Sequence, residues 1–145
     1  MGSELWMKTA CEIVDSLESG EISQLEVLES LEKRCRAVNP IVNALPTQCF
    51  ERARKIVKNA GSKLFAKQQP LIGLPIPIKD SYLVSGVRTT FGSLAFQNFV
   101  PEHSDLVTRT LEKSGGVIYA KSNTPEFEAG ASTFNEVFGI TRNPW

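Results

Sequence analysis

The chain has 145 residues, of which 41% are hydrophobic and 22% are charged, as is usual for a globular protein. Its 16 Lys and Arg residues balance its 16 Asp and Glu residues, so the formal net charge is zero. This balance gives no sign of a nucleic-acid partner or of binding to an anionic membrane. The three cysteines have no C-x-x-C spacing, so we expect neither a disulfide framework nor a zinc site. We expect no other metal and no cofactor.

The cellular location of the protein is predicted from the targeting signals that its sequence lacks. The first residues, Met1 to Trp6, contain neither the basic region nor the long apolar region of a secretory signal. No apolar run approaches the ~18 residues of a membrane span. Reduced cysteines also fit an intracellular protein. We therefore expect a cytoplasmic protein with no membrane partner.

The N-terminal part of the chain shows the periodicity of three amphipathic helices. Apolar residues recur at helical spacing over residues 5–19. Ser23 and Glu26 then form a capping-box pattern that predicts the start of a second helix. We expect this helix to end before Pro40, because the residue before a proline disfavours helical geometry. A third helix should end at Gly61.

The second half shows the pattern of an α/β protein. Ser104 is placed to cap a helix. The continuous apolar run from Val117 to Ala120 predicts a short buried strand. The polar run from Lys121 to Pro125 should end that strand. A helix, a tight turn, a buried strand and a polar loop are typical of the α/β class, in which sites collect just past the strand ends.

The most unusual stretch is Gly73-Leu74-Pro75-Ile76-Pro77-Ile78-Lys79-Asp80. Its prolines exclude a helix or an ordinary central strand, whereas Ile76 and Ile78 alternate as in a short, half-buried strand. The stretch would carry the Lys79 ammonium to the edge of an apolar layer. A single lysine in such a place is more often solvated than catalytic.

Other matches to catalytic motifs have structural explanations. Residues 116–122 have the outer spacing of a phosphate loop, but Ala120 stands where its second glycine is needed. His103, Ser104 and Asp105 contain the residue types of a serine triad, but neighbours in sequence seldom converge in space. We therefore assign no chemistry to these segments.

Four segments that follow one another in a fixed order identify a protein family far more specifically together than any one of them does alone. They are Gly73-Leu74-Pro75-Ile76-Pro77-Ile78-Lys79-Asp80, Thr89-Thr90-Phe91-Gly92-Ser93, Ala120-Lys121-Ser122-Asn123-Thr124-Pro125-Glu126-Phe127 and Phe138-Gly139-Ile140-Thr141-Arg142-Asn143-Pro144-Trp145. This series resembles the amidase signature family. The resemblance is detailed from about Leu71 onward and diffuse over the N-terminal helices.

The resemblance implies both a fold and a chemistry. The fold would be α/β, with helices flanking the first strands of a larger mixed β-sheet. The chemistry would be hydrolysis of a small-molecule amide by a Ser–cis-Ser–Lys triad through an acyl-enzyme, with Lys79 as the lysine. Gly130, Ala131 and Ser132 would lie near the substrate. A lysine is a base only where burial disfavours its charged form, so the apolar run should cover Lys79 and Asp80 should bind backbone amides instead.

By the same resemblance, the two serines and the oxyanion hole of the family follow the Asn143-Pro144-Trp145 run. We therefore expect residues 1–145 to be an incomplete single domain, with a helical region at 1–61 and the first part of the α/β core at 62–145. Alone, the chain should lack the nucleophile and hydrolyse no amide. Its partner would be the missing C-terminal part of the fold or another copy of the chain.

Two alternatives remain open. The chain could belong to the glutamine-hydrolysing A subunit of a tRNA-dependent amidotransferase, although Asn123 to Phe127 is more similar to the general amidases. It could also be a non-catalytic product of truncation or gene splitting that works only by association.

Overall fold

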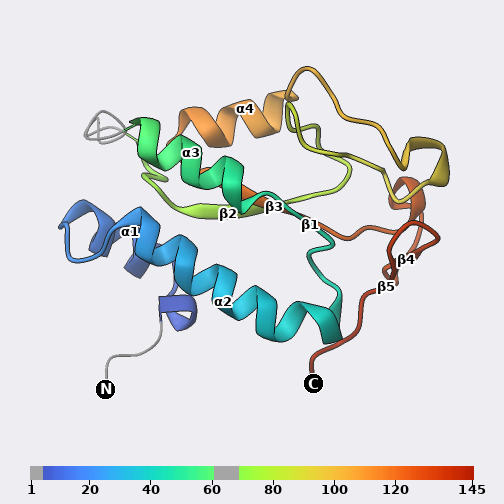
Figure 1. The fold of residues 1–145 in the computed structure, drawn as a ribbon, viewed down its shortest axis with the longest axis horizontal. Coiled ribbons are helices and arrows are strands. Elements are labelled where there is room, and N and C mark those ends of the chain that lie inside the picture. Colours follow the sequence, from blue (N-terminus) through green and yellow to red (C-terminus); the bar gives the residue numbers. More distant parts are fainter. Residues whose placement is uncertain (1–4, 61–68) are drawn as a thin grey trace.

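The computed structural model describes residues 5–60 and 69–145. The predicted helix end at Gly61 and most of the segment that follows it lie outside the described residues. A three-stranded sheet forms the middle layer, with strand order β1-β3-β2 (Figure 1). Its strands are β1 (Thr47–Gln48), β2 (Pro75–Lys79) and β3 (Val117–Ser122). The α-helices are α1 (Ala10–Glu18), α2 (Gln24–Val42), α3 (Phe50–Ala60) and α4 (Leu106–Lys113).

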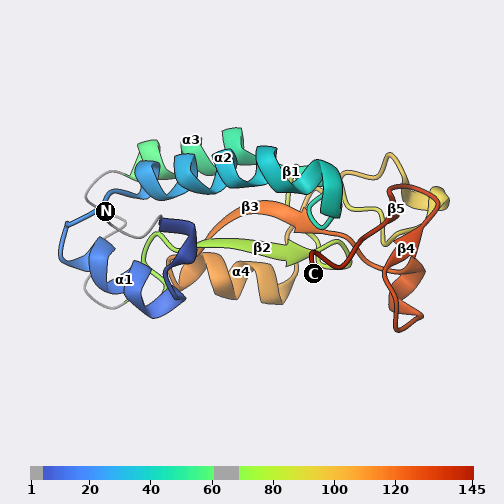
Figure 2. The same cartoon turned by 90° about the horizontal axis from the view of Figure 1, so that it is seen from below.

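Helices cover both faces of this sheet. Figure 2 shows α2 and α3 on one face and α4 on the other. The cluster between α2, α3 and the sheet contains Leu28, Cys35, Phe50, Ala53, Val57, Val117, Tyr119 and Ala120. The cluster on the opposite face contains Ile78, Val84, Val87 and Ile118. The predicted α/β class with flanking helices is confirmed. No described helix is long and apolar enough to cross a membrane.

The start of α2 agrees with the sequence, but its end does not. The Glu26 amide donates to the Ser23 hydroxyl, and the Ser23 amide donates to the Glu26 carboxylate, which confirms the capping box. The predicted end before Pro40 is wrong, since α2 continues to Val42. Pro40 lies in the last turn, where it removes the amide that would donate to the Arg36 carbonyl. Asn43 then ends the helix in the left-handed conformation, with φ of 55°.

The helix α4 is capped by a different residue from the one predicted. Asp105 is the N-cap, because its carboxylate accepts from the Thr108 amide at 2.9 Å. The Ser104 hydroxyl instead accepts from the Ser85 amide, also at 2.9 Å, and so joins two loops. The predicted helix is present, but its cap is one residue later than expected.

Strand β2 pairs in parallel with β3 through an irregular register. Ile76 pairs with Ile118, but the next pair joins Pro77 to Ala120, so Tyr119 has no partner on β2. Such an extra residue is a β-bulge, and it changes the face to which the following side chains point. The bulge coincides with a proline, which cannot donate a ladder hydrogen bond.

The bulge determines where Lys121 points. The predicted break at Lys121 is wrong, since β3 continues to Ser122 and Lys121 is fully buried. Beyond the bulge, Lys121 pairs with Ile78 and Ser122 pairs with Lys79. Because paired residues on adjacent strands share a face, Lys121 lies on the face of Ile78.

The last part of the chain lies beyond the carboxyl end of β2 (Figure 1). It contains a short helical turn (Glu126–Glu128) and a two-stranded ribbon of β4 (Phe134–Asn135) and β5 (Gly139–Ile140). Asn135 anchors this ribbon, since its amide nitrogen donates to the side chain of Asn123 and to the carbonyl of Thr124. The ribbon and the turn thus stay close to the end of β3.

Candidate active site

Lys79 is the last residue of β2, and its side chain is 39% exposed. Its ammonium lies 3.3 Å from a carboxylate oxygen of Glu128. The same oxygen accepts a hydrogen bond from the Ser81 hydroxyl. The expected apolar cover is absent among the described residues, because Ile78 points to the opposite face, where it is 5% exposed. Lys79 is thus partly solvated and ion-paired.

Glu128 is brought to Lys79 by an uncommon backbone geometry. Phe127 and Glu128 both have positive φ, of 46° and 64°, which is unfavourable for residues other than glycine. The Phe127 amide donates to the Phe91 carbonyl and the Glu128 amide to the Pro125 carbonyl, and these bonds hold the turn. The hydrogen bond from Ser81, with a smaller contribution from Lys79, lowers the pKa of Glu128. Glu128 is therefore a carboxylate at neutral pH.

The predicted substrate segment follows this turn directly. Gly130, Ala131 and Ser132 are all exposed. The Gly130 amide donates to the Glu128 carbonyl at 3.1 Å, so the segment begins beside the partner of Lys79. A cavity of about 350 Å³ is next to the segment, but these three residues do not line it. Their contact with a substrate remains a prediction.

Four phenylalanines form an aromatic cluster beside the turn. Phe96 is at its centre, with ring centroids 5.2 Å from Phe91, 5.9 Å from Phe99 and 6.1 Å from Phe127. The Phe127 side chain is 56% exposed. An exposed aromatic residue therefore precedes Glu128 in the turn that brings it to Lys79.

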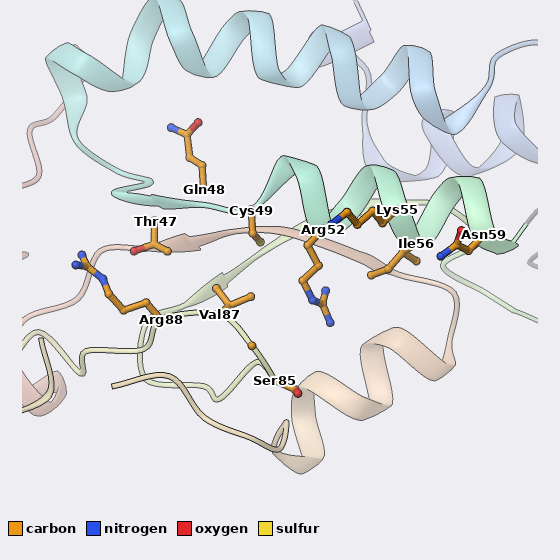
Figure 3. A pocket seen from close by; sticks show the side chains of 11 residues that line it. Thr47, Gln48, Cys49, Arg52, Lys55, Ile56, Asn59, Ser85, Val87 and Arg88 are labelled. Atoms are coloured by element: carbon orange, nitrogen blue, oxygen red, sulfur yellow. The ribbon is translucent and has the colours of Figure 1, made fainter. Parts of the chain in front are cut away.

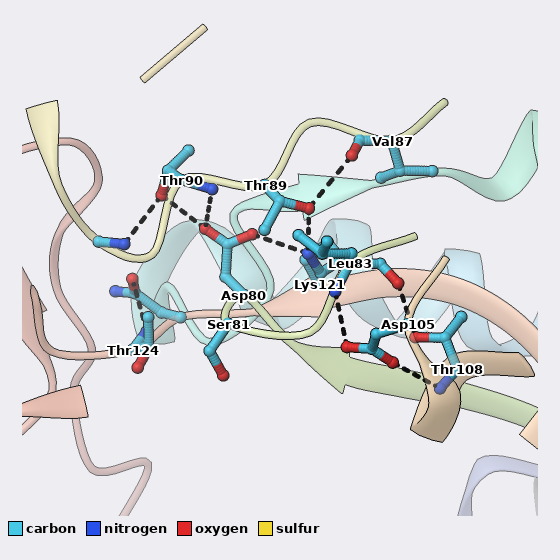
Figure 4. A network of polar contacts seen from close by, with 12 residues as sticks. Asp80, Ser81, Leu83, Val87, Thr89, Thr90, Asp105, Thr108, Lys121 and Thr124 are labelled. Carbon is cyan, nitrogen blue, oxygen red and sulfur yellow. Dashed lines mark hydrogen bonds and ion pairs between the residues drawn. The ribbon is translucent and has the colours of Figure 1, made fainter. Parts of the chain in front are cut away.

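A buried polar network begins at Asp80, the residue that follows Lys79 (Figure 4). Asp80 and Lys121 are both fully buried, and the Lys121 ammonium donates to Asp80 Oδ1 at 3.0 Å and to the Thr89 hydroxyl at 2.7 Å. Asp80 Oδ2 accepts from the Thr90 amide at 3.0 Å and from its hydroxyl at 2.5 Å. Asp80 thus binds a backbone amide as expected. It also has a counter-ion that sequence reasoning missed.

Lys121 was missed because it is the first residue of the polar run that ends at Pro125. Burial lowers the pKa of Lys121, whereas the charge of Asp80 opposes this change. One signal could have found the pair: Asp80 and Lys121 both stand at the carboxyl end of a predicted strand. Parallel strands bring such ends together, but the sequence did not show that these two strands are neighbours.

A larger cavity, of about 840 Å³, lies elsewhere, between α3, β1 and the loop at 85–88 (Figure 3). None of the predicted site residues lines it. Burial raises the pKa of Cys49, which lines this cavity, to about 11, so this thiol is a poor nucleophile near neutral pH. No described group of three His, Cys, Asp or Glu side chains could hold a metal ion.

Comparison with known proteins identifies the family of the chain. A model of the family described as Amidase matches residues 26–145. The chain belongs to the amidase family. The amidase resemblance of the four ordered segments is thus confirmed.

Similar proteins and similar solved structures support this family assignment. The chain is 37% identical over 143 residues to the glutamyl-tRNA(Gln) amidotransferase A subunit of Geotalea daltonii, and the match covers 98% of this chain and 30% of that protein. Among solved structures, 6-aminohexanoate cyclic dimer hydrolase is similar at 31% identity and a TM-score of 0.86, over 99% of this chain and 29% of that one.

A third similar protein is a bacterial aryl acylamidase of the amidase signature enzymes, with 26% identity and a TM-score of 0.83. That match covers 94% of this chain and 29% of the acylamidase. This amidase-family chain therefore spans about 30% of the length of the relatives it matches. At the level of the family, amide hydrolysis is the supported chemistry.

Proposed function

We propose that the chain is the N-terminal portion of an amidase that hydrolyses a carboxylic amide to an acid and ammonia or an amine. Lys79 would be the final proton acceptor of a Ser–cis-Ser–Lys triad. The observation that carries this proposal is the place of Lys79, at the carboxyl end of a strand built from the family's lysine motif. The adjacent carboxylate, Asp80, is turned away from it and paired elsewhere.

The proposed mechanism makes a clear demand on Lys79. A neutral Lys79 amine would take the proton of a bridging serine, which would deprotonate the nucleophilic serine as that serine attacks the amide carbonyl. The ion pair with Glu128 favours the charged ammonium, so Glu128 would have to release Lys79 first. Gly130, Ala131 and Ser132 would contact the small-molecule substrate.

The partners of Lys79 are proposed to lie outside residues 1–145. Motif order in the family places both serines and the oxyanion hole after the Asn143-Pro144-Trp145 run. In this proposal, the helical region at 1–61 and the first part of the α/β core at 62–145 form one incomplete domain. By itself the chain would hydrolyse no simple amide. It would act once joined to the rest of the fold, as a longer polypeptide or a separate chain.

A second candidate function is supported by the relatives. The similar proteins from Geotalea daltonii and Halorhodospira halophila are both named as the A subunit of glutamyl-tRNA(Gln) amidotransferase, at 37% and 39% identity. This supports glutamine as the amide. The similar solved structures include a 6-aminohexanoate cyclic dimer hydrolase and an aryl acylamidase, which supports a general amidase.

The coding DNA beyond the Trp145 codon decides whether the polypeptide continues. If it continues into a Gly- and Ser-rich segment, the longer protein should hydrolyse simple amides or glutamine. Lys79→Met should then lower the rate on the order of 10²–10⁴-fold, whereas Lys58→Met, at an exposed position of α3, should not. A fully active Lys79→Met protein would exclude Lys79 as the base. A stop codon there would support the association-only alternative.

A further inference from the structure

We propose that Lys121 is a positioning residue for Lys79. Through its buried ion pair with Asp80, it neutralises the carboxylate next to Lys79 and fixes the strand end from which Lys79 projects. This inference rests on the proposed role of Lys79 as a base. It assigns a task to a second lysine that touches neither substrate nor reacting atoms.

The faces of the sheet are the first part of the argument. Lys79 and Asp80 are consecutive and so point to opposite faces of β2. Lys121 lies on the Asp80 face because of the bulge at Tyr119, which pairs Lys121 with Ile78. Without the bulge, the alternation along β3 would place Lys121 on the other face, toward Lys79. The two lysines are thus separated by the sheet, and Asp80 has only one of them as its close partner.

The second part of the argument is the set of bonds that hold Asp80. Its amide donates to the Ser122 carbonyl at 3.0 Å, and its carbonyl accepts from the Phe91 amide at 3.1 Å. Its side chain is held by Lys121 and Thr90. The backbone of Asp80, and therefore of its neighbour Lys79, is fixed to β3 and to the loop that contains Thr90.

The same loop extends this control to the partner of Lys79. Thr90 accepts from the Gly92 amide at 3.1 Å, and the Phe91 carbonyl accepts from the Phe127 amide at 2.8 Å. Phe127 precedes Glu128, which pairs with Lys79. Hydrogen bonds and the short backbone segments between them therefore connect the ion pair to both the backbone and the carboxylate that determine where the Lys79 ammonium lies.

The charges explain why a lysine is needed at this position. Asp80 is fully buried, so without Lys121 its carboxylate would act more strongly on the charge of the adjacent residue, Lys79. Asp105 and Cys49 also face Lys121. The Cys49 thiol is uncharged at neutral pH, and Asp105 is occupied by the amides of Leu83 and Thr108. Lys121 therefore serves mainly Asp80.

Competitive acetylation of the 145-residue chain tests this proposal. A limiting amount of acetic anhydride reacts only with the uncharged form of a lysine amine. Peptide mass spectrometry across a pH series then gives the yield of acetylated Lys79. The pH at which this yield is half its maximum reports where the Lys79 ammonium loses its proton. Lys121→Met should raise that midpoint by about one pH unit, a tenfold loss of uncharged amine at a given pH. Asp80→Asn should lower it, since Lys121 then repels Lys79. The double variant should return it to the wild-type value.

These outcomes separate positioning from a structural role alone. If Lys121 only supported the fold, the variants would melt at lower temperature while the Lys79 midpoint stayed the same, and this result would overturn the proposal. If Lys121→Met does not fold, the comparison of Asp80→Asn with the double variant, which carries neither charge, still tests the proposal. Equal Lys79 midpoints in these two variants would also overturn the proposal. The test needs no turnover, so a longer protein that stays fully active with Lys79→Met would refute the proposed function and leave this result standing.

Discussion

Replacing Lys121 with methionine should destabilise this protein more than any surface change. The substitution keeps an unbranched side chain that is one atom shorter and leaves the Asp80 carboxylate fully buried without its counter-ion. Asp80 keeps its two hydrogen bonds from Thr90, whereas the Thr89 hydroxyl loses the donor at 2.7 Å. Removal of one partner of a buried ion pair costs about 3–5 kcal/mol in the free energy of unfolding.

Urea unfolding followed by circular dichroism measures this cost. With a denaturant slope of about 2 kcal/mol per molar urea, 4 kcal/mol lowers the midpoint by about 2 M. Asp80→Asn alone should also be costly, but the double variant should cost less than the sum of the two, because neither charge is then unpaired. Lys55→Met, at an exposed position of α3, should change stability by less than about 0.5 kcal/mol.

Two results would refute this reasoning. One is a cost below about 1 kcal/mol for Lys121→Met, since the ammonium would then contribute no more than an exposed one. The other is strict additivity of the Lys121 and Asp80 substitutions, which would show that the two side chains act independently.

Three further predictions concern other parts of the structure. In urea unfolding, Gly92→Ala should cost at least about 1 kcal/mol more than Gly86→Ala. Both glycines have positive φ, +68° at Gly92 and +72° at Gly86, but only at Gly92 would the new Cβ lie 2.9 Å from a backbone carbonyl oxygen. Equal costs for the two substitutions would contradict this prediction. At pH 8, Ellman's reagent should modify the exposed Cys11 quickly and Cys49 slowly, because a thiol with a pKa of about 11 is about one-thousandth ionised there; similar rates would show that Cys49 is accessible. Because the pKa of Glu128 is lowered, its ion pair with Lys79 should be present above pH 4.5, the ordinary pKa, and should be lost as pH falls through the lower pKa of the folded protein. Carbon-13 NMR of the Glu128 carboxyl group measures this pKa. A titration midpoint at or above 4.5 would contradict the prediction.

The features that were correctly predicted rest on short stretches of sequence. The capping box of α2 needs only Ser23 and Glu26, which are three residues apart. The strand that contains Lys79 follows from the alternation of Ile76 and Ile78 between prolines. The family follows from four ordered motifs. Such signals act over a few residues, so they can be recognised without knowing which segments meet in space.

The tertiary structure alone decided the surroundings of Lys79. Asp80 and Lys121 are 41 positions apart and meet because β2 and β3 are neighbours, with a bulge that turns Lys121 to the Asp80 face. The contact between Lys79 and Glu128 likewise depends on a turn held by a distant loop. A lysine in a polar run looks solvated in the sequence. It can be buried here because another strand supplies the opposite charge, and only packing determines which residue that is.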